Sequence, residues 1–322
     1  MRLSVSIPGK VMIAGEYVAL RGASVLASAV GPGMTLEFDS YPESAKWVVE
    51  SEIWSHPREV DVLESQPNSL VDPLLACVWD AARRSDVIGG KLSVRSCLRI
   101  QDGLGTSSAL RLGVALGFSR MNSKIGDPMR LAWEWQKQAQ NKASGYDVVT
   151  QFHGGTVLMQ GLSEQEWPGD VQKLEMRNLS DNGLQLYGGG EGAPTQQVMS
   201  STLDWLSDEP DRWERLRTNS ILFQNAFLKQ HPDQYELCGK LRDSLEGCPY
   251  FPKKLAHELK RIDGVDKSWS FKFTGAGGED AILLLGDAKQ LELVGDLINS
   301  LGWNRIDKKL GYQGARIIEE SF

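Results

Sequence analysis

Small and hydroxyl-bearing residues with the potential to bind phosphate are concentrated at residues 101–110. This segment joins a strand-like pattern to an apolar helical pattern. Glycine lets a ligand approach the backbone closely, and the first amides of a helix lack intrahelical partners and attract anions. We therefore predict a phosphate-binding loop, although one of its hydroxyl side chains could instead only cap the helix. The loop residues are Gly103, Leu104, Gly105, Thr106, Ser107 and Ser108.

Two further segments place charged residues in apolar surroundings. Residues 8–17 follow the first strand-like run and contain Lys10, Glu16 and Tyr17. On the pattern alone, a lone lysine such as Lys10 usually extends to solvent. Residues 141–150 contain Asp147 directly after a helix-breaking Ser-Gly pair. Asp147 could cap a helix, or in a phosphate cleft it could accept the proton of a hydroxyl group.

A fourth segment, residues 273–281, contains three glycines within four positions. This exceeds what a hairpin needs and is compatible with close approach of a ligand to the backbone, or with a wide loop and a bulge. The two common nucleotide fingerprints are absent from the chain. No lysine follows Gly105 as GxxxxGK[ST] requires, and Ser108 occupies the third glycine position of GxGxxG.

The elements that must position these segments alternate between strand and helix in the first half. Strands are predicted near residues 3–7, 25–29, 34–38, 47–50, 92–100 and 155–160, and helices over 69–84 and from Pro128. The second half is mainly helical from 195 to 261. Strands are predicted over 183–187, 268–274, 281–285 and 316–319, and a helix over 288–301. The polar stretch 161–170 suits a domain connection, so the chain is predicted to divide there.

The composition is typical of a globular protein, with 322 residues of which 41% are hydrophobic and 24% charged. The net charge of -7 argues against a nucleic-acid partner or an anionic membrane surface. Four cysteines and four histidines show no zinc spacing and no disulfide framework. No signal peptide or membrane-spanning run is evident, so we expect a cytoplasmic protein.

In this order and spacing, the four segments resemble the GHMP kinase superfamily, named for galactokinase, homoserine kinase, mevalonate kinase and phosphomevalonate kinase. The resemblance extends from Pro8 to Ala281. It implies an α+β, two-domain fold. Residues 1–165 would form the N-terminal ribosomal-protein-S5-like ATP-binding domain, and residues 166–322 the C-terminal ferredoxin-like α/β-plait domain.

Within the superfamily, the motifs look most similar to those of phosphomevalonate kinases. Tyr17 stands where mevalonate kinases more often have histidine, and an acidic residue stands at Asp280. Mevalonate kinase and a sugar or sugar-phosphate kinase remain alternatives, because Gly-Leu-Gly-Thr-Ser-Ser also occurs in sugar-directed relatives. Diphosphomevalonate decarboxylase and a non-catalytic ligand sensor are less favoured.

The resemblance implies ATP and Mg²⁺ as cofactors, a small polar or phosphorylated alcohol as acceptor, and a monomer or homodimer. Asp147 and Lys10 would be catalytic, and the 103–108 loop would bind ATP. Ser107 would bind Mg²⁺ when the motif is counted from Gly103, whereas counting back from Ala109 favours Ser108. Gln136 and Gln140 stand where many members use a glutamate for the metal. Lys10, Lys142 and Arg111 are candidate partners of a phosphorylated acceptor. The implied acceptor-binding residues are Glu16, Tyr17, Lys142, Ser144, Gly145, Gly275, Ala276, Gly277 and Asp280.

Overall fold

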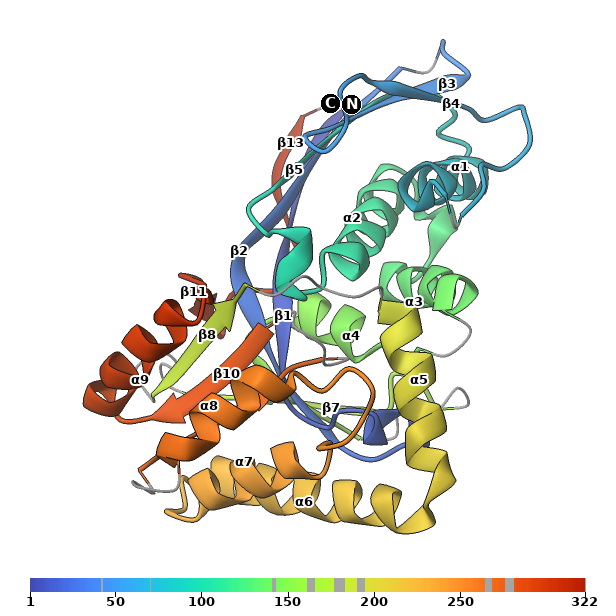
Figure 1. Cartoon of the computed structure of the whole chain (residues 1–322). Coiled ribbons are helices and arrows are strands. Elements are labelled where there is room, and N and C mark those ends of the chain that lie inside the picture. Colours follow the sequence, from blue (N-terminus) through green and yellow to red (C-terminus); the bar gives the residue numbers. More distant parts are fainter. Residues whose placement is uncertain are drawn as a thin grey trace.

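Two β-sheets and the helices packed on them make up the computed structural model (Figure 1). It describes residues 1–41, 43–69, 71–140, 143–160, 166–176, 183–189, 195–263, 268–275 and 281–321. The mixture of helices and mainly antiparallel sheets confirms the predicted α+β class.

Two long strands, β1 (Arg2–Ala14) and β2 (Val25–Ser40), form the centre of the larger sheet. The predicted strand ended at residue 7, but β1 continues to Ala14, with register shifts between Ile7 and Gly9 and between Met12 and Ala14. The two strands predicted near residues 25–29 and 34–38 are the single strand β2. Among the described residues this sheet has nine strands, in the order β13-β1-β2-β5-β3-β4, with β6, β7 and β12 alongside. The shorter members are β3 (Lys46–Ser51), β4 (Arg58–Asp61), β5 (Gly90–Ser96) and β6 (Thr156–Gln160).

Helices cover one face of this sheet (Figure 1). Their apolar side chains bury a core with alternate residues of the long strands, because successive strand residues point to opposite faces. The first helix begins at Pro73, four residues later than predicted. The helices are α1 (Pro73–Ser85), α2 (Thr106–Met121), α3 (Pro128–Gln140) and α4 (Tyr146–His153), with short 3-10 turns η1 (Val18–Arg21), η2 (Ile100–Asp102) and η3 (Ser123–Ile125).

The smaller sheet has four strands in the described part of the chain, in the order β11-β8-β10-β9. Helices pack on both of its faces, so β10 is buried throughout. Leu283 and Leu285 join the core that contains residues of α6 and α7, whereas Ile282 and Leu284 join the core of α8 and α9. No helix among the described residues is both long enough and apolar enough to cross a membrane. These elements are β8 (Leu184–Gly188), β9 (Trp269–Phe273), β10 (Ala281–Gly286), β11 (Asn304–Arg305), α5 (Thr195–Asp208), α6 (Pro210–Leu228), α7 (Gln234–Asp243), α8 (Lys253–Asp263) and α9 (Ala288–Ser300).

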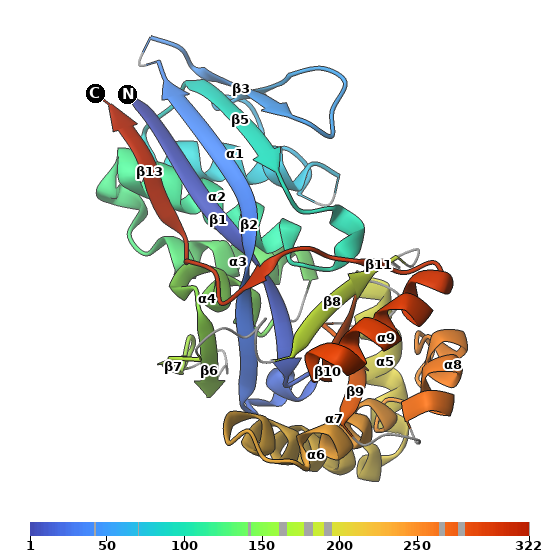
Figure 2. The same ribbon diagram turned by 90° about the vertical axis from the view of Figure 1, so that its left-hand side faces the viewer.

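Strand pairing crosses the predicted division between residues 165 and 166. Three strands that follow it, β7 (Asp170–Leu174), β12 (Lys309–Leu310) and β13 (Arg316–Ser321), belong to the larger sheet. β13 pairs with β1, so the first and last strands lie side by side (Figure 2). The two-domain boundary stays a prediction, and the sheet order shows that the chain returns to the first sheet at its end.

Candidate active site

The predicted phosphate loop lies between η2 and the start of α2. Gly103 and Gly105 both adopt left-handed backbone angles, with φ of 62° and 79°. α2 starts at Thr106, and its N-cap is Gly105, which provides no side-chain cap. The interpretation of a hydroxyl residue as the N-cap is therefore wrong, because Thr106, Ser107 and Ser108 lie inside the first turn. The helix end retains the amide groups that attract anions.

Lys10 is buried beneath this loop, with only 7% of its surface exposed. Its Nζ donates a hydrogen bond to the carbonyl of Gly103 at 2.9 Å, and its backbone amide donates to the carbonyl of Leu104 at 2.8 Å. A Cβ on Gly105 would lie 2.9 Å from Lys10 Cγ, so the glycine provides space for the lysine side chain. The expectation that Lys10 extends to solvent is therefore wrong.

Asp147 lies in the first turn of α4 and is also buried. Its Oδ1 accepts a hydrogen bond from the amide of Val148 at 3.0 Å, and its Oδ2 accepts one from Nε2 of Gln136 at 2.8 Å. The N-cap of α4 is Gly145, so Asp147 does not cap this helix. Its carboxylate is instead held in one orientation at the cavity.

Two stacked tryptophans hold the turn that leads into α4. The rings of Trp133 and Trp167 stack with centroids 4.4 Å apart and planes at 5°. Their Nε1 atoms donate hydrogen bonds to the carbonyls of Ala143 and Ser144, each at 3.0 Å. Gly145 has a φ of 71°, and a Cβ there would lie 2.5 Å from Trp133 Cδ1 and 2.6 Å from Trp167 Nε1. The indole pair therefore fixes where α4 begins.

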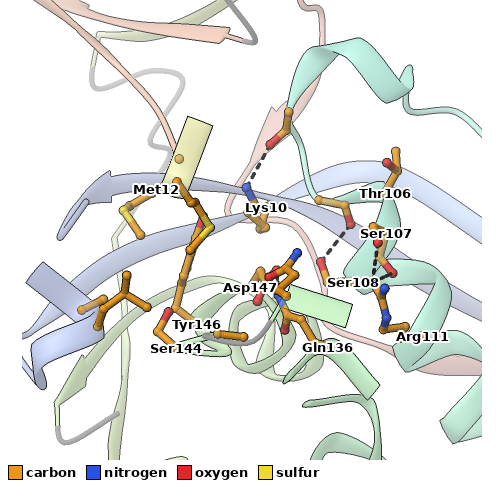
Figure 3. Close-up of a pocket in the computed structure, with 18 of the residues that line it drawn as sticks. Lys10, Met12, Thr106, Ser107, Ser108, Arg111, Gln136, Ser144, Tyr146 and Asp147 are labelled. Carbon is orange, nitrogen blue, oxygen red and sulfur yellow. Dashed lines mark hydrogen bonds between the residues drawn. The ribbon is translucent and has the colours of Figure 1, made fainter. Parts of the chain in front are cut away.

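These segments surround one cavity of about 520 Å³ (Figure 3). Lys10 and Asp147 lie near its middle. Figure 3 shows Met12 on one side of this pair, and Thr106, Ser107 and Arg111 on the other. The lining residues from the predicted site are Lys10, Tyr17, Gly103, Gly105, Thr106, Ser107, Ser108, Ser144, Asp147 and Gly275.

The other predicted residues take different places. Glu16 is 2% exposed and forms a buried ion pair with Lys272, which also donates a hydrogen bond to the carbonyl of Phe273 at 2.9 Å. Burial raises the pKa of Glu16, and the charge of Lys272 acts in the opposite direction. Leu104 and Gly145 are absent from the cavity lining and support the loop and the turn by packing. Lys142, Ala276, Gly277 and Asp280 lie outside the described residues.

The charges of the described lining are two cations, Lys10 and Arg111, and one carboxylate, Asp147. Lys10 Nζ lies 5.4 Å from the ring centroid of Tyr146. Burial raises the pKa of the Tyr146 hydroxyl, and the positive charge of Lys10 partly opposes this effect. A Cβ on Gly275 would lie 3.7 Å from Lys10 Nζ, so the backbone of the fourth segment reaches the same point.

The described lining does not fit a magnesium site at Ser107. Mg²⁺ prefers oxygen ligands that include carboxylates, but the Ser107 hydroxyl accepts a hydrogen bond from the Arg111 guanidinium, which places a positive charge beside it. Both oxygens of Asp147 accept hydrogen bonds. No group of three or more His, Cys, Asp or Glu side chains suited to a metal occurs among the described residues. Ser107 as a metal ligand stays a prediction.

Sequence reasoning missed the contact of Gln136 with Asp147 and the apolar end of the cavity. Gln136 lies at helical spacing from the buried residues Ala132 and Trp133, and a polar residue on such a face is a signal for a buried hydrogen bond. Met12 and Met199 line the apolar end. No local pattern distinguishes them from ordinary core residues, because methionine commonly fills apolar interiors.

No protein-family model matches the chain. A mevalonate kinase from Aeropyrum pernix is 30% identical over 162 residues, and this match spans 47% of the chain and 48% of that protein. The Lin0012 protein of Listeria innocua superimposes with a TM-score of 0.80 at 18% identity, covering 99% of this chain and 100% of that chain.

Two enzymes with known ligands have the same fold. Galactokinase from Lactococcus lactis, complexed with galactose, has a TM-score of 0.75 at 13% identity and covers 98% and 95% of the two chains. Phosphomevalonate kinase from Streptococcus pneumoniae, in complex with phosphomevalonate and AMPPNP, has a TM-score of 0.72 at 17% identity and covers 96% and 99%. The chain therefore has the fold of these kinases, and in sequence it matches about half the length of the mevalonate kinase from Aeropyrum pernix.

Proposed function

We propose that this protein is an ATP-dependent kinase that transfers the γ-phosphoryl group of ATP to a hydroxyl group of a small molecule. The observation that carries the proposal is the cavity itself. Lys10 and Asp147 line it between the 103–108 loop on one side and an apolar end on the other. A cation and a carboxylate between two binding ends match the needs of phosphoryl transfer to an alcohol.

The roles follow from the position of each group. The α2 amides bind the β- and γ-phosphates, and Lys10 neutralises charge on the transferring phosphoryl group. Asp147 accepts the proton of the acceptor hydroxyl or fixes its orientation, and Gln136 holds the carboxylate for this task. We expect ATP to bring Mg²⁺ with it as a phosphate complex, in which the ion offsets the phosphate charge.

For the acceptor we propose phosphomevalonate, which would give diphosphomevalonate. The motifs around Tyr17 and Asp280 support this choice, as do the two cations of the cavity, which suit a phosphorylated acceptor. Tyr17 also lines the cavity. The kinase from Streptococcus pneumoniae, whose solved complex contains phosphomevalonate, shares the fold.

Mevalonate is the second candidate, because the curated relative with the sequence match is a mevalonate kinase. A sugar is supported less well. The cavity lining includes the apolar side chains of Met12, Ala19, Leu20 and Met199, and Met12 lies on the side away from Ser107 and Arg111. These apolar side chains offer no hydrogen bonds to sugar hydroxyls, whereas they suit a branched aliphatic carbon skeleton.

The test is a coupled ADP-release assay with purified protein, ATP and Mg²⁺. Phosphomevalonate, mevalonate, homoserine and several sugars and sugar phosphates are compared by kcat/KM. We expect phosphomevalonate to be preferred. Preference for mevalonate or a sugar would overturn the acceptor but keep the kinase. Carbon dioxide release would identify a decarboxylase, and absence of ADP with every acceptor would point to a ligand sensor.

A further inference from the structure

Arg111 is a buried cation that has no counter-ion among the residues that the structure describes. It lies on α2, five residues after Thr106, and is 5% exposed. No described carboxylate lies within ion-pair distance of its guanidinium, whereas Arg120 on the same helix pairs with Glu320 at 2.9 Å. Charged side chains are rarely buried without a partner, because removal of a charge from water is costly.

The side chain is nevertheless held in place at the phosphate loop. Its Nη1 donates hydrogen bonds to the carbonyl of Ser107, at 3.1 Å, and to the Ser107 hydroxyl. Both of its hydrogen bonds to described residues come from Nη1, so Nε and Nη2 keep their donor capacity. Because the Ser107 oxygen accepts from Arg111, its own hydroxyl proton is free to be donated to a ligand.

Arg111 also faces the cavity of the candidate active site. It lines the cavity together with Ser107 and Ser108, on the side of the reacting pair away from Met12 (Figure 3). A planar guanidinium binds two oxygens of a phosphoryl group at once, and such charge-assisted bonds are strong in a water-poor site. The first-turn amides of α2 attract the same kind of ligand.

We propose that Arg111 and the Ser107 hydroxyl form a phosphoryl-binding site, in which the bound phosphoryl group is the missing counter-ion of the buried arginine. The phosphoryl group would come either from the nucleotide or from a phosphorylated acceptor. Only this choice of source rests on the proposed kinase function.

The free energy of unfolding of the unliganded protein distinguishes this proposal from a structural role of Arg111. Removal of an unpaired buried charge relieves a cost, so Arg111→Met, which is similar in length, should leave the unliganded protein as stable as the wild type or more stable. If Arg111 had a structural role instead, Arg111→Met would lower the free energy of unfolding. Arg111→Lys keeps the charge but loses the planar fork.

The experiment measures the thermal midpoint of the wild type, R111M, R111K and the control R120M, without ligand and with pyrophosphate. We expect pyrophosphate to raise the wild-type and R120M midpoints, to raise R111K less, and to raise R111M least. The dissociation constant for pyrophosphate should weaken about tenfold or more in R111M. A destabilised R111M that still binds pyrophosphate like the wild type would overturn the site.

Kinetics then identify the source of the phosphoryl group. A rise in KM for ATP with unchanged KM for the acceptor assigns the site to the nucleotide, and the reverse assigns it to a phosphorylated acceptor. If the wild type turns over no acceptor, the kinase proposal fails while the pyrophosphate measurement still decides the site. Unchanged KM values for both substrates in R111M would contradict the proposal.

Discussion

Gln136 Nε2 donates a 2.8 Å hydrogen bond to Oδ2 of Asp147 and so joins α3 to the first turn of α4. The other carboxylate oxygen accepts from the amide of Val148. Both contacts are made by neutral donors and hold the carboxylate in one orientation. The same helix also contributes Trp133, which holds the carbonyl of Ala143 three residues before Tyr146. One helix therefore orients both the backbone and the side chain of the proposed base.

The first prediction concerns Gln136→Glu, which replaces the amide with a carboxylate at hydrogen-bond distance from Asp147. Two such carboxylates share a proton until the pH is raised, because both cannot be charged at low cost. We expect turnover to fall about tenfold at low pH and to recover as the pH rises and the shared proton is lost. The measurement is the pH profile of kcat. Gln138→Glu places the same charge on the exposed side of α3 and should keep the wild-type profile.

Lys10→Met removes the cation beneath the phosphate loop. We expect kcat to fall by about 100-fold or more, because the charge that develops on the phosphoryl group is no longer offset. Lys46→Met changes an exposed lysine in the same way and should leave kcat unchanged. Steady-state rates with saturating ATP, and circular dichroism to verify folding, test this. A folded Lys10→Met protein with wild-type turnover would remove Lys10 from the mechanism.

Asp147→Asn keeps the shape of the side chain but removes the proton acceptor. We expect kcat to fall by roughly 10²- to 10⁴-fold. Pyrophosphate binding should be retained, since the phosphate loop is intact. Single-turnover kinetics and a pyrophosphate titration measure the two effects separately. Normal turnover would show that Asp147 has no part in the chemistry.

Gly145→Ala should destabilise the protein because the new Cβ would meet both indole rings, at 2.5 Å and 2.6 Å. Gly22 has nearly the same backbone angles, with φ of 76° and ψ of 11°, but an added Cβ there meets nothing within 4 Å. Gly22→Ala therefore measures the backbone strain alone, about 1–2 kcal/mol. We expect Gly145→Ala to exceed it by about 1–3 kcal/mol in denaturant unfolding. Equal losses of unfolding free energy in the two variants would mean that the tryptophan rings move aside without cost.

The buried hydroxyl of Tyr146 should lower the free energy of unfolding at alkaline pH. Burial raises the pKa of its hydroxyl above the value in the unfolded chain. The unfolded state therefore loses this proton first as the pH rises, so this contribution to stability is complete below about pH 10 and is lost above it. Tyr146→Phe should flatten that part of the alkaline decline in the free energy of unfolding. An identical decline in both proteins would exclude Tyr146 as its source.

The sequence predicted the elements and the membership of the cavity better than the contacts inside it. Short-range periodicity located most strands and helices, but Pro8 and Gly9 look like a break in the pattern. β1 passes through them by a register shift that only its partner β2 reveals. The partner of Lys10 is the carbonyl of Gly103, and the partner of Glu16 is Lys272. Contacts between residues so far apart in the chain leave no local pattern. The sequence alone therefore predicted that Lys10 extends to solvent.

The pairing of β13 with β1 has a consequence for how the protein is made. β1, which contains Lys10, gains its second neighbour from residues 316–321, the last described part of the chain. On the ribosome, the outer edge of this strand therefore stays open until residues 316–321 have been made, and open edges invite pairing with other chains. Loss of Arg316–Ser321 should therefore lower the yield of folded protein in the cell and increase aggregation, because the edge of β1 would then stay open.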